Sequence, residues 1–331
     1  MTPDKERRFS SMEDRPEQLA QWYTDARMLA LRTQAGVQRI PYTVEFSYIG
    51  RTDLFESWGY AEVLERQYRF PVELTGYKEH IYAKYPSQIA RPDDHGAVCP
   101  RVQHFFVSNA GNPRWKIEFA NYADQVGTNM YPDELLSPPI RVDNTTTDAT
   151  CVRELDQLLA RCPNRLPSFD ASRLSNTIGV SVGIMAKRED GREVVLWRRR
   201  SLEVRIYPGM PATPLSFALN LPIRDWHGSQ ALRDLVFADY NAERAEELGV
   251  EQHLFSPLMP LAFCRDLPRA GKPQLFLEKR SWIPFEQLRA HVVQNSAEWI
   301  GDLQALDVGA PPPADASPEL LAYLALRQMA S

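Results

Sequence analysis

The sequence has little of several features that mark whole classes of protein. Only four cysteines occur in 331 residues, at Cys99, Cys151, Cys162 and Cys264, and no two of them form a Cys-x-x-Cys pair. A secreted domain held together by disulfides, or a structural zinc site, needs more cysteines at closer spacing. The scarcity of cysteine therefore favours a reducing compartment, and we expect a cytoplasmic protein.

Long hydrophobic runs are also missing. The longest nearly apolar runs are "TIGVSVGIMA" (177–186) and "LFSPLMPLAFC" (254–264). A membrane-spanning helix needs about 20 apolar residues, so both runs predict buried strands instead. The opening residues, "MTPDKERRFSSMEDRPEQ", contain no apolar core of a signal peptide. We therefore expect no association with a membrane.

Charge of one sign does not dominate either half of the chain. Residues 1–170 carry 20 Lys and Arg against 24 Asp and Glu, and residues 171–331 carry 18 against 19. The net charge is −5. A protein that binds nucleic acid along its surface is usually basic, so we expect no nucleic-acid scaffold. A local site for a small anion remains compatible with these counts.

The composition is that of a globular protein with a core, because 44% of the residues are hydrophobic. The length suits two domains. The sequence becomes regular in strands near residue 174, which predicts an N-terminal α+β accessory domain over 1–170 and a second domain over 171–308. Residues 309–331 begin with "GAPPPADASPE" and predict a Pro/Ala linker followed by a C-terminal helix.

Periodicity and turn residues predict the individual elements. In the N-terminal part we expect a helix over 14–34, a strand over 42–49, a hairpin over 103–122 and a short helix over 148–162. In the second part we expect a hairpin over 177–200, a helix within 228–250, a strand pair over 255–282 and a helix over 284–306.

The segment "GSQALRDLVFADYNAERAEELGV" (228–250) carries an unusual group of acids. At helical spacing, Asp239, Glu243, Glu246 and Glu247 fall within one arc of about 100°. Like charges three and four residues apart destabilise a helix by a few tenths of a kcal/mol per pair. The group predicts either a solvated acidic face or a site for a divalent cation, which would remove the repulsion.

The opposite side of this helix is expected to pack on a sheet. Small apolar residues recur there at helical spacing. They are Ala231, Leu235, Ala238, Ala242 and Ala245.

The same segment resembles the Nudix box, G-x5-E-x7-R-E-U-x-E-E-x-G-U, in which U is a bulky aliphatic residue. Six of the nine fixed positions match, namely Gly228, Glu243, Glu246, Glu247, Gly249 and Val250. The hairpin before the box and the strand pair after it agree with the family's order of elements. The resemblance covers about residues 174–307 and implies a Nudix-type α/β/α sandwich with a mixed sheet, so that the whole chain would be α+β.

The resemblance also implies an activity. Nudix hydrolases split a diphosphate linked to a nucleoside or another group, with Mg²⁺ or Mn²⁺. Carried over by position, Glu243, Glu246 and Glu247 would hold the metal, and one of them, or an acid from a later loop, would act as the base. Side chains near the box could bind the substrate's phosphates, and the candidates are Arg198, Arg199, Arg200, Arg205 and His227.

Three positions depart from the family's pattern. Asp234 replaces a Glu, Ala242 stands where the family has an Arg that orients the carboxylates, and Arg244 stands where it has an aliphatic residue. These changes leave two main hypotheses open. The first is a hydrolase of nucleoside-diphosphate-linked compounds, and the second is a weak or inactive Nudix-fold module that binds a nucleotide-type ligand or a protein partner. A structural protein with a coincidental acidic helix is a third hypothesis, and the N-terminal extension could cap the pocket, recruit a partner or form a homodimer.

Overall fold

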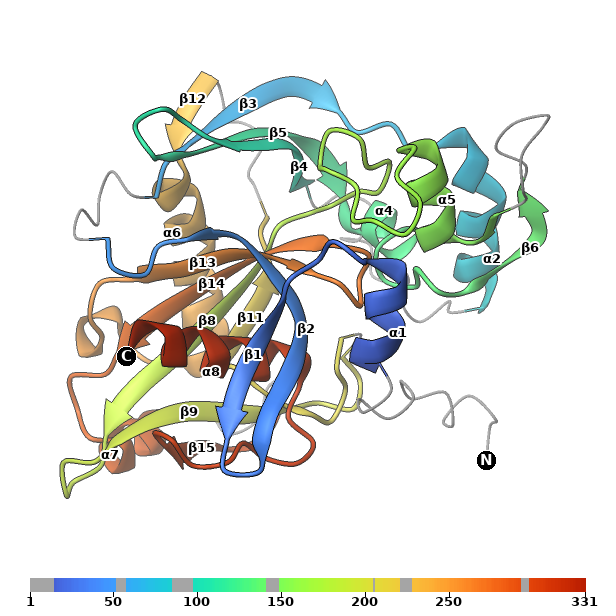
Figure 1. The fold of residues 1–331 in the computed structure, drawn as a ribbon. Helices are drawn as coiled ribbons and strands as arrows, with labels where there is room; N and C mark the ends of the chain where they lie inside the picture. The colour runs from blue at the N-terminus through green and yellow to red at the C-terminus, as the bar shows by residue number, and fades with distance from the viewer. Residues whose placement is uncertain are drawn as a thin grey trace.

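The computed structural model of the chain describes residues 15–51, 58–84, 98–140, 149–204, 206–220, 228–292 and 298–331. Its main feature is a nine-stranded sheet in the order β1-β2-β13-β14-β8-β9-β10, with β11 paired to β8 and β15 paired to β9 (Figure 1). β14 and β8 run parallel, and the other pairs in this sheet are antiparallel. The strands are β1 (Met28–Thr33), β2 (Gly36–Ser47), β8 (Gly179–Lys187), β9 (Glu193–Arg200), β10 (Pro211–Ala212), β11 (Leu215–Ala218), β13 (Met259–Asp266), β14 (Lys272–Arg280) and β15 (Trp299–Asp307).

Helices cover both faces of this sheet because successive strand residues point to opposite sides. Leu275 and Leu277 of β14 enter one core together with α6 (Leu232–Glu243) and α7 (Phe285–His291). Phe276, between them, enters a second core with α8 (Pro318–Ala330). The predicted fold class is confirmed, since a mixed sheet between helices in an α+β chain is compatible with a Nudix-type α/β/α sandwich.

The expected domain boundary at residue 170 is crossed by strand pairing. β2 lies second from one edge of the main sheet, where Phe46 pairs with Phe263 of β13. β1 and β2, residues 28–47, therefore belong to the same sheet as strands from the later residues. The separate folding of the rest of residues 1–170 stays a prediction.

A smaller sheet lies beside the main one, in the order β12-β3-β5-β4 (Figure 1). β3 (Tyr60–Gln67), β4 (Val98–Val107) and β5 (Pro113–Asn121) come from the N-terminal part, and β4 and β5 form the predicted hairpin. β12 (Gly228–Ala231) is the first strand of the box segment, and it pairs with β3. The start of the box is thus fixed by the N-terminal part of the chain.

The remaining N-terminal elements form a cluster of their own. They are α2 (Thr75–Lys84), α4 (Tyr122–Val126), α5 (Val152–Leu159), the short helix η2 (Val72–Leu74) and the strand pair β6 (Leu135–Ile140) and β7 (Ala149–Cys151). Arg153 of α5 is fully buried and connects this cluster to the rest. Its guanidinium donates to the Tyr23 hydroxyl and, at 2.8 Å, to the backbone oxygen of Leu267.

Two predicted helices are only half helical. The expected helix over 14–34 consists of α1 (Arg15–Trp22) and then strand β1, whose burial alternates with the strand period. The expected helix over 284–306 is α7 followed by strand β15, which pairs with β9. In both cases the helix ends well before the predicted boundary, and the residues after it form a strand because they pair with a neighbouring strand.

The C-terminal helix is part of the core. The Ser317 side chain caps α8 by accepting from the Leu320 amide, and Pro318 occupies the first turn. Tyr323 is fully buried against the sheet, and its ring lies where a side chain on Gly183 would have to go. Residues 318–326 are therefore integral to the second core, although the sequence predicted a helix beyond a linker. Within the described residues, no helix is long and apolar enough to cross a bilayer.

Candidate functional site

The box segment forms β12, α6 and then one wider helical turn over Arg244–Leu248, here called η5. Gly249 ends the helix with a φ of 66°, and its amide donates to the Arg244 backbone oxygen at 3.2 Å. Glycine takes this left-handed conformation without a steric penalty, which explains a glycine at this point of the motif. Val250 follows in a buried position.

The face that the helix buries differs from the one predicted. Leu232, Val236 and Tyr240 are buried in the core, whereas Ala238, Ala242 and Ala245 are exposed. The predicted packing stripe is therefore confirmed for Leu235, which is buried in the core, and wrong for these three alanines. Larger side chains spaced four residues apart remove more apolar surface from water, and this effect set the orientation of the helix.

The acids continue the buried face. Around the helix axis, Asp239 and Glu243 lie at nearly the same angle as Leu232 and Val236. Their side chains therefore point toward the sheet, as those of the two apolar residues do. Glu243 is only partly exposed, Glu247 is buried, and Glu246 is exposed. The four acids therefore do not form one solvated face.

Burial and like charge act together on Glu243. Burial, followed by the negative charges of Asp239, Glu247, Glu246 and Glu298, raises its pKa from 4.5 to about 8. Burial also raises the pKa of Asp239 to about 6, although the Asn220 amide donates to its carboxylate at 2.8 Å. These shifts describe a pocket of negative charge that is only weakly compensated.

One member of this group could not be found from the local sequence. Glu298 precedes β15, about fifty residues after the box, in a stretch that the sequence predicted to be helical. Only the pairing of β15 with β9 brings it near Glu243.

The group has the ligand chemistry of a hard divalent cation, for which carboxylate oxygens are the preferred donors. In the described part of the chain, however, no three His, Cys, Asp or Glu side chains converge on one point closely enough to hold a metal ion. The carboxylates are thus the type of ligand that Mg²⁺ or Mn²⁺ prefers, but in this structure they lie apart from one another.

Arg198 of β9 contacts the helical turn that carries Glu247. Its side chain is fully buried, and its Nη1 donates to the backbone oxygen of Glu247 at 3.0 Å. Burial lowers the pKa of Arg198, and the negative charge of Glu247 opposes that effect. The guanidinium carbon also lies 5.5 Å from the centre of the Trp299 ring. Arg198 thus holds the last turn of the box helix on the sheet.

The other candidate arginines are held by intramolecular partners. Arg200 is buried and donates to Glu319 of α8 at 3.1 Å. Arg199 points to the other side of the strand, because successive strand residues alternate, and donates to Asp315 at 2.6 Å. Arg205 and His227 lie outside the described residues. The substrate-binding role of these five residues stays a prediction.

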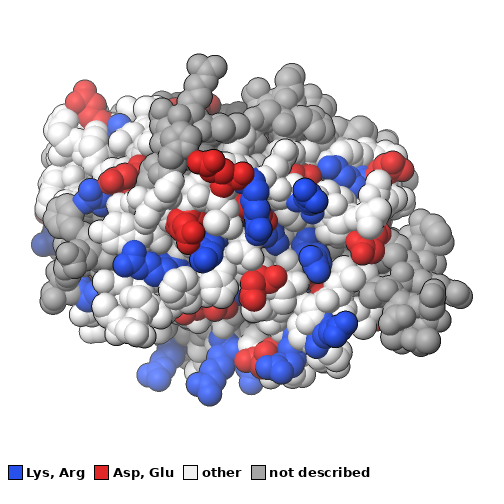
Figure 2. All heavy atoms as spheres, turned by 90° about the horizontal axis from the view of Figure 1, so that it is seen from above, with Lys and Arg blue, Asp and Glu red and all other residues white. Residues whose placement is uncertain are grey.

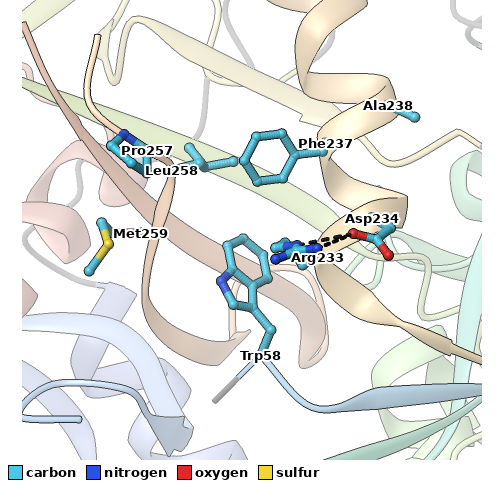
Figure 3. Close-up of a pocket in the computed structure, with 8 residues that line it drawn as sticks. All are labelled: Trp58, Arg233, Asp234, Phe237, Ala238, Pro257, Leu258 and Met259. Carbon is cyan, nitrogen blue, oxygen red and sulfur yellow. Dashed lines mark hydrogen bonds and ion pairs between the residues drawn. The ribbon is translucent and has the colours of Figure 1, made fainter. Parts of the chain in front are cut away.

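A separate cavity of about 520 Å³ lies on the other side of α6 (Figure 3). Trp58, Phe237 and Met259 point toward it, and Asp234 lies at its edge, bonded to the neighbouring Arg233 at 2.9 and 3.0 Å. Asp234 is the residue that occupies the second position of the box. It is therefore not part of the acidic group around Glu243.

Charge on the molecular surface is mixed. On the face shown in Figure 2, Lys and Arg lie among Asp and Glu, and neither sign forms a continuous field. This agrees with the near balance of basic and acidic residues in each half of the sequence.

Comparisons with known proteins add two structural neighbours. No protein-family model matches the chain, and no curated protein matches it. One similar solved structure is DR0079 from Deinococcus radiodurans, which is 18% identical over 40% of this chain and 68% of that one, with a TM-score of 0.26. Another is the Nudix hydrolase RenU from M. smegmatis, which is 14% identical over 46% of this chain and 84% of that one, with a TM-score of 0.27. The structures to which this chain is similar thus include a Nudix hydrolase.

Proposed function

We propose that the protein is a Nudix-type hydrolase that splits the diphosphate of a nucleoside-diphosphate-linked compound with Mg²⁺ or Mn²⁺. The observation that carries this proposal is the environment of Glu243. Its carboxyl group is partly withdrawn from water among four other carboxylates, and its pKa is raised to about 8. A site of this kind has an excess of negative charge, which a divalent cation would offset.

In this proposal Glu243, Glu246 and Glu247 are the metal ligands. When bound, the cation would supply positive charge for the substrate's phosphates and make a water molecule more acidic. Arg198 is a positioning residue, because its bond to the Glu247 backbone oxygen fixes the helical turn that carries Glu246 and Glu247. It comes from β9 and would replace the orienting arginine that the resemblance places at Ala242.

The direct test is a screen of nucleoside-diphosphate-linked compounds with and without Mn²⁺, with release of phosphate-ester products as the readout. Glu243→Gln should reduce turnover by two or more orders of magnitude, in the range typical of an essential acid–base or ligand group. Glu203→Gln removes an exposed glutamate outside the acidic group and serves as the control. Equal turnover in wild type and Glu243→Gln would contradict the proposed site.

A binding module without turnover is the second candidate. It is favoured by the separation of the acids, since no three described ligand-type side chains converge on one point. In that case nucleoside diphosphates should stabilise the protein in EDTA as well as in Mn²⁺, and no product should form. A requirement for Mn²⁺ in both binding and product release would exclude this candidate.

A further inference from the structure

Three buried polar atoms lie at the C-terminal end of the box helix without hydrogen-bond partners among the described residues. They are Nε of Arg244, Oε1 of Gln252 and Nζ of Lys279. Arg244 and Gln252 line an open hollow of about 640 Å³, together with Ala245 and residues 249–251 and 253. Lys279 reaches this region from β14, and its side chain is 1% exposed.

The groups around Lys279 stabilise its ammonium charge less well than water would. Its Nζ lies 4.7 Å from the centre of the Tyr240 ring and 5.9 Å from that of the Phe255 ring. Contacts with ring faces offset only part of the cost of removing an ammonium group from water. Burial, and then the positive charge of Arg244, lower the pKa of Lys279 to about 8.

Arg244 is held only at one end. One of its terminal nitrogens donates to the backbone oxygen of Val250, whereas its Nε has no hydrogen-bond partner among the described residues. The family that the box resembles has an aliphatic residue at this position, so the pattern of the box does not require an arginine here. Arg244, which is partly exposed, and the buried Lys279 thus carry two positive charges at the same end of the box helix.

The geometry points to a binding site for a tetrahedral oxyanion, such as a phosphate group, formed by Arg244 and Lys279 at the end of the box helix. One oxyanion would remove the repulsion between the two cations and accept from Arg244 Nε and Lys279 Nζ. Rotation of the Gln252 side-chain amide would add a third donor. The negative end of the helix dipole opposes an anion here, but its charge of about one half is smaller than that of two cations.

This site is distinct from the acidic group and does not depend on the proposed hydrolysis. Its test therefore uses the whole chain in EDTA, without metal and without turnover. Sodium sulfate is the first probe, because sulfate keeps its charge between pH 7 and 9, and sodium chloride at equal ionic strength is the reference. Wild type should show a saturable rise in Tm and saturable heat of binding with sulfate.

Two substitutions remove one cation each. Lys279→Met and Arg244→Leu should each weaken sulfate binding at least tenfold, and Lys279→Met should raise Tm without anion because a buried amine without a partner is gone. Lys187→Met, at an exposed lysine near the end of β8, is the control and should bind as wild type does. Equal sulfate binding in wild type and Lys279→Met would mean that sulfate binds only as an adventitious surface ion, and it would refute the proposed site.

The wild-type protein alone gives an independent check. Because Lys279 loses its proton around pH 8, sulfate affinity should fall about tenfold between pH 7 and pH 9. Inorganic phosphate and a phosphate monoester, compared at pH 7, then separate a free anion from a phosphate group on a larger molecule. The absence of any saturable response to all three probes would refute the proposal, whether or not the variants fold.

Discussion

Replacing Glu243 by glutamine should stabilise the protein in the absence of metal, and the gain should depend on pH in a defined direction. The folded pKa of Glu243 is about 8, whereas its ordinary value is 4.5. Between these two values the folded state holds a proton that the unfolded state has released, so stability falls as pH rises through this window. Glutamine stays neutral, so the variant lacks this loss.

The size of the effect follows from the shift. At about 1.4 kcal/mol per pKa unit, the difference between 4.5 and about 8 sets an upper limit of about 5 kcal/mol for ionising Glu243 in the fold. Partial exposure screens the interaction, so we expect a gain of about 1–3 kcal/mol for Glu243→Gln at pH 9. Below pH 4.5 the carboxyl group is protonated in both states, and the gain should vanish.

The assay is urea unfolding in EDTA at pH 4, 6.5 and 9, for wild type, Glu243→Gln and the control Glu203→Gln. Mn²⁺ is then added at pH 7.5, where it should stabilise wild type and leave Glu243→Gln unchanged, because a ligand that binds only the folded state stabilises it by mass action. A gain that is the same at all three pH values would show that Glu243 is not desolvated among like charges. A wild-type stability that does not respond to millimolar Mn²⁺ would refute the metal site.

Three further predictions concern the surroundings of the site. Glu319→Gln should cost about 3–5 kcal/mol, because it removes the buried carboxylate at 3.1 Å from Arg200 and leaves only the more distant Glu298 at 3.9 Å; urea unfolding measures this loss. Arg198→Ala should lower Tm by several degrees, because it removes a fully buried side chain. Arg199→Ala should change Tm little, because the ion pair of Arg199 is partly exposed. Thermal melts of the two variants test this difference. Ala242→Arg places the family's arginine at an exposed position, and a product assay should show no gain in turnover if Arg198 already fixes the turn, whereas a gain would mean that the orienting group is missing.

Much of the fold could be predicted because the signals were local. The hairpin around residues 109–112 and the one around 188–192 each combine alternating strands with turn residues. The αL glycine at Gly249 and the buried Val250 follow from the box pattern alone. These features depend on neighbours in the sequence, and periodicity describes them well.

The secondary-structure predictions were wrong where the structure of a segment depends on residues that are distant in the sequence. Residues 28–33 are compatible with a helix, and they become strand β1 because β2 and α8 offer them partners. Trp299 begins a strand rather than continuing a helix because β9 has a free edge for it. Strand pairing crosses the expected boundary near residue 170 for the same reason, since β2 pairs with β13 across more than two hundred residues. No periodicity within one segment carries this information.

The acidic helix illustrates the limit for the site. The sequence placed Glu243, Glu246 and Glu247 on one arc, and it could not determine whether that arc faces water or the sheet. Burial of Val236 and Tyr240 turned the arc inward, which is why Glu243 is desolvated and Glu246 is not. The charge that completes the group, Glu298, lies just before β15, in a distant part of the sequence.

The box helix carries opposite charge imbalances on two sides, and this favours a ligand-binding function over a purely structural one. Glu243 and Lys279 both have pKa values displaced toward neutrality, to about 8 in each case. A chain that required only stability would pair such groups with each other or replace them with apolar residues of similar volume. Here the fold places each of them near charges of its own sign, Glu243 near acids and Lys279 near Arg244. Such uncompensated groups destabilise the isolated protein, and a divalent cation on one side and an oxyanion on the other would remove that cost.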